Sequence, residues 1–201
     1  MEHLHNFVLL LSAYFIGCLS TGFYITYLMA GQDIRKIGSG STGATNVKRV
    51  LGKKGFYLTL AGDALKGFFT VLWAYYLDVE AYMVVLAITF CVAGHIFPVQ
   101  LKFKGGKGLA VALGGFLTFD YRLILSFFVC YGILYLTLHK KYMLSGIIVI
   151  ALFPVFAYFA GHRNSVLLII SLLTILVLYA HKDNIIHLWK QYFNIQKNKT
   201  E

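Results

Sequence analysis

The chain has 201 residues, of which 59% are hydrophobic and 13% are charged, about half the charged fraction that a soluble domain carries. This composition excludes a soluble globular domain and a disordered chain. Eighteen Lys and Arg residues against eight Asp and Glu give a net charge of +10. Because no soluble basic module is present, the excess indicates loops that face anionic lipids or anionic substrates, and no nucleic-acid partner.

Seven apolar stretches follow one another along the chain. A helix needs about 20 apolar residues to cross the roughly 30 Å hydrocarbon core of a bilayer, and six stretches come near or exceed this length. The stretches cover residues 7–30, 55–77, 81–99, 108–119, 123–138, 142–161 and 164–180. We therefore predict an all-α polytopic membrane protein, a single domain over 1–201 with seven transmembrane helices, of which 108–119 is the short one.

The distribution of Lys and Arg predicts the orientation of these spans. With seven crossings, fifteen of the eighteen basic residues fall on one side of the membrane. Their segments are 31–54, 99–107, 139–142 and 181–201. Only Arg122 and Arg163 fall on the other side, and Lys66 lies within a span. Because cytoplasmic loops carry the excess of positive charge, we predict an N-terminus outside and basic segments on the cytoplasmic side of the membrane.

The last of these segments, 181–201, differs from a plain polar tail. Apolar side chains recur in it at spacings of three and four with lysines between them, a pattern typical of a helix in the membrane interface. These side chains are Ile185, Ile186, Leu188, Trp189, Tyr192 and Phe193. We predict a short helix on the inner face with membrane lipid as its partner, and no obligate protein partner is indicated.

The first inner segment contains a loop rich in glycine and hydroxyl residues, IGSGSTGATNVKRVLGKKG over 37–55. Glycines such as Gly38, Gly40 and Gly43 let backbone N–H groups approach an anion, and short hydroxyl side chains add donors. Those hydroxyl residues are Ser39, Ser41, Thr42 and Thr45. A helix that starts near Ala44 would place Thr45 and Arg49 on one face, where a phosphate could bind. A flexible turn whose cations contact lipid headgroups would explain the same pattern.

The second inner segment repeats this theme. FKGGKG over 103–108 places Lys107 next to the start of the short apolar helix, where the helix dipole adds positive charge. An ordinary lysine turn at the lipid surface is the alternative. His95, at the end of the preceding span, is expected to be a hydrogen-bonded structural residue. Asp63 and Lys66, inside an apolar stretch, are expected to pair, since a charge at membrane depth is costly unless it is paired.

The third candidate segment is AHKDN over 180–184, where the last span meets the inside. His181 and Asn184 are three residues apart and can face one pocket, and Ser145 is placed to reach the same rim. The three cysteines lie within apolar stretches, and metal-ligand motifs, a nucleophile elbow and a His-x4-Asp dyad are missing from the sequence. We therefore expect neither a metal nor a cofactor, and chemistry based on anion binding.

These three segments resemble the motifs of one known family. GSGSTGATNVKRVLGKKG, GHIFPVQLKFKGGKG and HKDN, in this order and on one face, are similar to the motifs of the bacterial acyl-phosphate:glycerol-3-phosphate acyltransferases of the PlsY type. The resemblance covers essentially the whole chain. The family usually has Asn and an aliphatic residue where Ser41 and Thr42 stand, and Glu where Asp183 stands.

The resemblance implies transfer of a fatty acyl group from acyl phosphate to the 1-hydroxyl of glycerol 3-phosphate, giving lysophosphatidic acid and phosphate. It implies catalytic roles for Ser39, Arg49, Lys107, His181 and Asn184. Ser39 and Thr45 with the first-motif backbone would cradle the acyl-phosphate head, and Ser145 would help the basic residues to hold glycerol 3-phosphate. The remaining substrate-binding positions that it implies are Gly38, Gly40, Gly43, Ala44, Asn46, Lys104, Gly105, Gly106 and Gly108.

Acyl phosphate is an activated mixed anhydride, so fixed geometry and charge stabilisation are sufficient for catalysis. We expect direct attack by the hydroxyl group without an acyl-enzyme, with the substrate phosphate as proton acceptor and His181 as a positioning group. The alternative from the residues alone is a membrane transporter of phosphate or organophosphate anions, since buried charges and glycine-interrupted helices also occur in that class.

Overall fold

A computed structural model describes the backbone of residues 2–200 and the side-chain surroundings of 3–191. The described residues form α-helices and two short 3-10 helices without strands, which confirms the all-α prediction. The helices are α1 (Glu2–Cys18), α2 (Thr21–Ala30), α3 (Ala44–Tyr76), α4 (Ala81–Ile96), α5 (Leu109–Phe119), α6 (Tyr121–Thr137), α7 (Tyr142–Phe159), α8 (Asn164–Ala180) and α9 (Lys182–Thr200). The 3-10 helices are η1 (Ile34–Lys36) and η2 (Val99–Leu101).

The first predicted span, 7–30, is broken in the structure. α1 ends at Cys18 and α2 begins at Thr21, so carbonyl groups at the break lose their helical partners. Two side chains from elsewhere replace those partners. Lys66 Nζ donates to the Leu19 carbonyl at 2.8 Å, and Gln100 Nε2 donates to the Cys18 carbonyl. The break therefore connects α1 and α2 to α3 and to the segment that follows α4.

α3 joins the first glycine-rich loop to a predicted span. It begins at Ala44, as predicted, and runs for 33 residues to Tyr76. Gly52 has φ 63° and ψ −155°, which kinks the helix. The kink separates a short first part, which carries Thr45 and Arg49, from the longer part that contains Asp63 and Lys66. The first part of α3, which carries Arg49, is thus continuous with a helix whose later part is buried in the core.

The molecular surface is apolar over much of the helical body. Large hydrophobic side chains such as Leu28, Tyr76 and Phe159 are 79–81% exposed, as expected where lipid is the solvent. By length and composition, His3–Ala30, Ala81–Leu101 and Tyr142–Phe159 can each cross a membrane. Counting Asn164–Ala180 and Lys182–Gln191, bent by 61°, as one span adds a fourth. Among the described residues, the remaining helices lack this combination of length and apolar composition, and the seven-span count stays a prediction.

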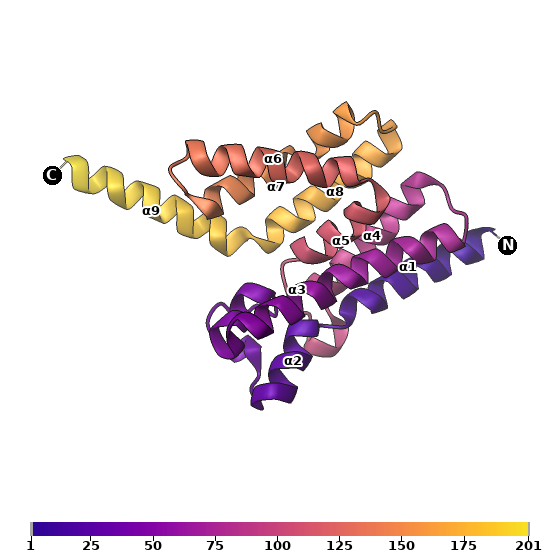
Figure 1. The fold of residues 1–201 in the computed structure, drawn as a ribbon, viewed down its shortest axis with the longest axis horizontal. Coiled ribbons are helices and arrows are strands. Elements are labelled where there is room, and N and C mark those ends of the chain that lie inside the picture. Colours follow the sequence, from indigo (N-terminus) through magenta and orange to yellow (C-terminus); the bar gives the residue numbers. More distant parts are fainter. Residues whose placement is uncertain (1, 201) are drawn as a thin grey trace.

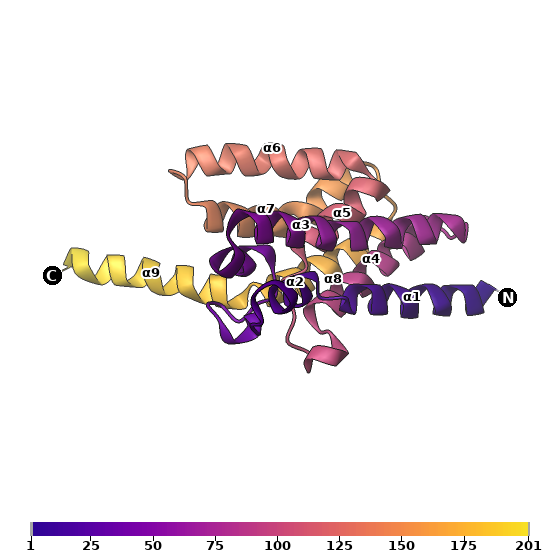
Figure 2. The same ribbon diagram turned by 60° about the horizontal axis from the view of Figure 1, so that its bottom comes forward.

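Successive helices run back and forth between two ends of the molecule (Figure 1, Figure 2). The N-terminus lies at one end, with the α3–α4 and α7–α8 connections, while α9 projects from the other. The loops after α2 and after α6 lie toward the α9 end in both views. The basic segments of the sequence thus gather toward one end. The short helix α5 lies in the interior, with Val111, Gly115 and Phe116 buried.

Candidate active site

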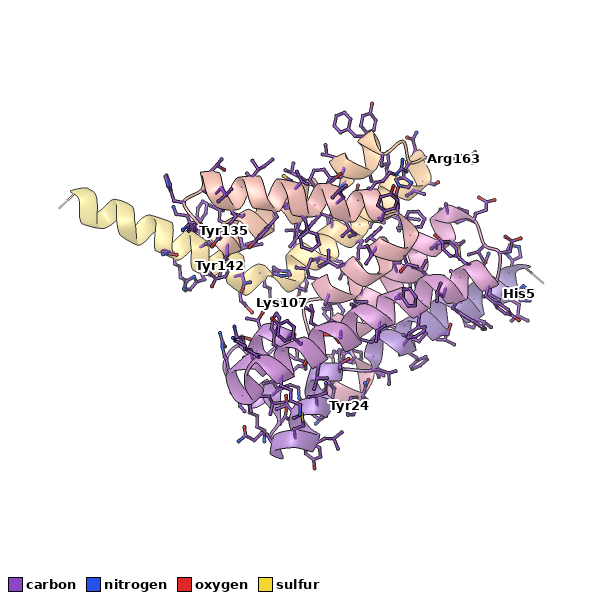
Figure 3. The ribbon with its side chains drawn as sticks, in the orientation of Figure 1. His5, Tyr24, Lys107, Tyr135, Tyr142 and Arg163 are labelled. Atoms are coloured by element: carbon purple, nitrogen blue, oxygen red, sulfur yellow. The ribbon has the colours of Figure 1, made fainter. Side chains whose placement is uncertain are left out.

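The second and third motifs meet through a direct hydrogen bond. Lys107 Nζ donates to the Asn184 Oδ1 atom at 2.8 Å, although the two residues are 77 positions apart in the chain. Lys107 comes from the loop before α5, and Asn184 from the first turn of α9. Figure 3 shows Lys107 beside the α8–α9 junction, far from Arg163 and His5 at the other end. The predicted proximity of these two motifs is therefore present.

The charge around Lys107 connects it to the first motif. Burial lowers the pKa of Lys107, the nearby Asp183 carboxylate opposes this shift, and the Arg49 guanidinium adds to it. Arg49 and Lys107 are thus close enough for their charges to repel each other. Two cations held near each other favour a dianionic phosphate, which relieves the repulsion between them.

His181 lies beside this cluster at the end of α8. Its side chain is buried, and Nδ1 donates to the Val177 carbonyl at 2.8 Å. Because a carbonyl oxygen only accepts, the neutral ring carries its proton on Nδ1 and a lone pair on Nε2. Burial lowers the pKa of His181, the hydrogen bond to the Val177 carbonyl opposes this shift, and the Lys107 charge adds to it. Nε2 is therefore an acceptor at neutral pH.

Asn46 shapes the first glycine-rich loop from inside. It is 2% exposed, and its amide nitrogen donates to the carbonyls of Ile34, Ile37 and Ser41 at 2.9–3.2 Å. Its Oδ1 atom accepts from the Ser39 backbone N–H and from Arg49, both at 3.1 Å. The amide is fully engaged within the protein, and the substrate contact expected from the sequence stays a prediction. Asn46 therefore holds the loop and orients Arg49.

Gly38 explains why this loop can approach Arg49 so closely. Its φ of +58° is unfavourable for residues with a side chain, and a methyl group here would overlap the Arg49 guanidinium and the Asn46 amide. Next to it, Ser39 is exposed, as are Thr45 and Arg49 on the first turns of α3. The predicted clustering of a hydroxyl group, a helix start and a guanidinium is therefore present at the surface.

The first and second glycine-rich loops are hydrogen-bonded to each other. The Thr42 backbone N–H donates to the Gly105 carbonyl at 3.3 Å. Gly105 and Gly106 in turn donate to the carbonyls of Ile96 and His95 at 3.1 and 3.0 Å. Local sequence patterns carry no signal for this connection, because it joins segments more than 60 residues apart. The two loops form one layer over the end of α4.

The remaining predicted residues lie around the cluster of Arg49, Lys107, His181 and Asn184. Gly40 lies in the first loop, Gly43 and Ala44 form the start of α3, and Gly108 forms the start of α5. Lys104 is exposed. Ser145 is fully buried, and its hydroxyl group donates to the Lys141 carbonyl one turn earlier at 3.0 Å. The structure thus brings together Arg49, Lys107, His181 and Asn184, whereas Ser145 uses its proton within α7.

An apolar cavity lies next to the charged cluster. It lies between α5, α6, α7 and α8. The lining includes Leu109, Ala112, Phe116, Phe153, Leu173 and Val177. Leu109 follows Lys107 by two residues, and the Val177 carbonyl is the acceptor for His181. A molecule with an anionic head and an apolar tail would fit this arrangement.

Comparison with known proteins decides between the classes that this geometry allows. Residues 7–191 match the glycerol-3-phosphate acyltransferase family. This chain belongs to that family. Glycerol-3-phosphate acyltransferase 1 of Desulfitobacterium hafniense is 40% identical over 177 residues, which cover 88% of this chain and 87% of the relative. Glycerol-3-phosphate acyltransferase of Bacillus subtilis is 38% identical, covering 89% and 91%.

Solved structures of the family extend the likeness to the fold. The crystal structure of PlsY (YgiH), an integral membrane glycerol 3-phosphate acyltransferase, in its glycerol 3-phosphate form has a TM-score of 0.83. The identity is 34%, over 92% of each chain. The lysophosphatidic acid form has a TM-score of 0.81 at 33% identity. Membership of this family confirms the resemblance inferred from the three motifs.

Proposed function

We propose that this protein transfers a fatty acyl group from acyl phosphate to the 1-hydroxyl of glycerol 3-phosphate. The products are lysophosphatidic acid and phosphate, at the entry to phospholipid synthesis. The observation that carries this proposal is the cluster of Arg49, Lys107, His181 and Asn184 beside an apolar cavity. Relatives named glycerol-3-phosphate acyltransferase support it, as does a similar structure in a lysophosphatidic acid form.

The proposed reaction is a direct acyl transfer. The 1-hydroxyl oxygen attacks the acyl carbon, the carbon–oxygen bond to phosphate breaks, and the hydroxyl proton passes to the departing phosphate. Arg49 and Lys107 stabilise the phosphate charges, while the lone pair on His181 Nε2 accepts a hydrogen bond that helps to position glycerol 3-phosphate. Ser39 and Thr45 with the first-loop backbone hold the acyl-phosphate head. An acyl group trapped on a serine or cysteine would contradict this mechanism.

The apolar cavity supplies a place for the acyl chain. Its lining residues come from four helices, and each CH₂ group buried there contributes about 0.8 kcal/mol to binding. The carbonyl carbon of a chain in this cavity would lie toward Lys107 and His181. This position would bring the acyl carbon to the site where the glycerol hydroxyl group is held.

We also propose seven crossings, with α1 and α2 forming the first, and an active site at the cytoplasmic side of the inner membrane. The charge distribution and the alternating direction of the helices support this orientation. α9 would then lie along the inner surface. Its exposed Ile185, Ile186 and Trp189 side chains fit contact with lipid, whereas the surroundings of Tyr192 and Phe193 lie outside the described residues.

A single assay tests the reaction and its donor. Purified protein is mixed with labelled glycerol 3-phosphate and acyl phosphate, and lysophosphatidic acid is measured. We expect product with acyl phosphate and none when acyl-CoA replaces it at the same concentration. Equal product from acyl-CoA would overturn the donor assignment. Uptake of glycerol 3-phosphate into proteoliposomes without acylation would favour the transporter alternative.

A further inference from the structure

Three ionisable side chains lie buried together outside the cluster described above. Asp63 and Lys66 of α3 and His95 of α4 are 2%, 6% and 3% exposed. Lys66 Nζ lies 2.8 Å from Asp63 Oδ1 and 3.2 Å from His95 Nδ1. Because an ammonium group only donates, His95 Nδ1 accepts, and the neutral ring carries its proton on Nε2. We call these three residues the buried network.

Stability alone does not explain such a network. Buried ion pairs are often replaced by apolar residues without loss of stability, because desolvation offsets their attraction. What the network supplies is a fixed geometry between segments. Lys66 also donates to the Leu19 carbonyl at the break between α1 and α2, so one ammonium group joins α3, α4 and the first helix pair.

The network ends at the second glycine-rich loop. The His95 ring lies directly against Gly106, where a methyl group would overlap Nε2. The backbone N–H of Gly106 donates to the His95 carbonyl at 3.0 Å. Gly106 immediately precedes Lys107, whose ammonium group is held by Asn184. The imidazole thus supports the backbone from which the key cation projects.

We propose that Asp63, Lys66 and His95 are positioning residues that fix the Gly105–Gly106–Lys107 backbone for binding of glycerol 3-phosphate. This inference rests on the proposed function and assigns a role to charges that the reaction itself does not use. The network acts through Lys107, so its loss should weaken acceptor binding much more than donor binding.

The test compares two pairs of charges at opposite ends of the protein. Asp63→Asn with Lys66→Met removes the buried pair without leaving an uncompensated charge. Asp120→Asn with Arg122→Met is the control, since that ion pair lies at the α5–α6 connection. We expect the first double variant to raise the KM for glycerol 3-phosphate at least tenfold and the KM for acyl phosphate less than threefold. The control should change neither KM by more than twofold.

A second measurement decides the matter if the first double variant does not fold. Gly106→Ala pushes the loop away from the imidazole, and in a His95→Ala background the same methyl group has room. We expect the rise in glycerol 3-phosphate KM caused by Gly106→Ala to be at least fivefold smaller in that background. Unchanged KM values in a folded network variant, or equal effects of Gly106→Ala in both backgrounds, would overturn the proposal. A wild-type protein that makes no lysophosphatidic acid would instead overturn the proposed function.

Discussion

The cations of the candidate site and those at the opposite end of the molecule have different kinds of partner. At the end with the α5–α6 and α7–α8 connections, Asp120 accepts hydrogen bonds from the Arg122 guanidinium at 2.7 Å and from His162 at 3.0 Å. At the α9 end, Arg49 and Lys107 donate to the amide oxygens of Asn46 and Asn184. A carboxylate cancels the charge of its cation, whereas an amide fixes the cation in place and leaves its charge intact.

The difference teaches how a site for anions is distinguished from a structural ion pair. The Arg122 hydrogen bonds hold the pKa of Asp120 below its usual range, so this pair stays charged and satisfied. Lys107 has its pKa lowered, chiefly by burial, with Asp183 opposing and Arg49 contributing. Its charge is therefore imperfectly compensated, and binding of a phosphate would stabilise it.

The largest expected effect is loss of a cation at the site. Arg49→Ala or Lys107→Ala should lower kcat/KM for glycerol 3-phosphate about 100-fold or more, because each removes a charged donor to phosphate. Arg163→Ala, an exposed residue at the other end, should stay within about twofold of wild type. Initial rates of lysophosphatidic acid formation measure both. Near-normal rates for both site variants would contradict the site assignment.

Replacing the Asn184 amide, the partner of Lys107, by a carboxylate should give the second largest effect. Asn184→Asp keeps the shape of the side chain but cancels the charge of Lys107, so we expect a roughly 30- to 100-fold rise in the KM for glycerol 3-phosphate. Asn184→Ala removes only a hydrogen bond to a charged group, so it should raise the KM for glycerol 3-phosphate about tenfold. A carboxylate variant that binds the acceptor better than the alanine variant would refute the distinction between amide and carboxylate partners.

Two glycines with positive φ differ in their surroundings, since Gly38 lies against Arg49 and Gly161 has open space around it. Substitution at Gly38 should therefore affect activity, and substitution at Gly161 only stability. Gly38→Ala should reduce kcat/KM about tenfold, because the methyl group displaces Arg49. Gly161 has φ +83° and open space around it, so Gly161→Ala should cost about 1–2 kcal/mol of stability from backbone strain alone. We expect its activity at low temperature to match wild type. Thermal unfolding and steady-state kinetics on both variants distinguish the two effects.

The smallest expected effect concerns stability against pH. Burial lowers the pKa of His181 in the folded state below its unfolded value of about 6.5. Below that value the unfolded chain binds more protons, so stability should fall as the pH drops from about 6.5 toward the folded pKa. The loss in the free energy of unfolding is at most about 1.4 kcal/mol per pH unit. Each kcal/mol lost lowers the midpoint temperature of unfolding by roughly 2–4 °C.

His181→Gln should remove this dependence between pH 7.5 and pH 5.5, as followed by thermal unfolding. Asp120→Asn is the comparison from the other end. The pKa of Asp120 is lowered from 3.8, mainly by the Arg122 hydrogen bond, so its stabilising effect is lost only in stronger acid. The titration of Asp120 itself therefore contributes no pH dependence to stability over this range. A His181→Gln protein that keeps the wild-type pH slope would disprove the assignment.

Much of the fold follows from sequence because apolar length and charge are local properties. The boundaries of α5 to α8 lie within about two residues of the predicted spans, and the start of α3 at Ala44 follows from the loop before it. The break after Cys18 was not predicted, since an apolar stretch of 24 residues masks the polar Ser20 and Thr21 within it. The break depends on Lys66 and Gln100, which arrive from other parts of the chain.

The site was predictable in its residue types and less so in their roles. Arg49, Lys107, His181 and Asn184 were identified from motifs, and the structure brings them together. Sequence could not show that Asn46 turns inward, because helix phase and tertiary packing decide which neighbour of Thr45 is buried. It also could not show that His95 contacts Lys66, 29 residues away. Both are contacts between segments, which local patterns do not encode.

Asn46 has a consequence for how tightly the substrates can be held. Its side chain takes part in five hydrogen bonds with the loop and with Arg49. The conformational entropy of that loop is thus lost when the protein folds, and little is left to lose when an anion arrives. A phosphate group entering this site meets a loop already in place, so little of its electrostatic attraction is offset by ordering of the loop.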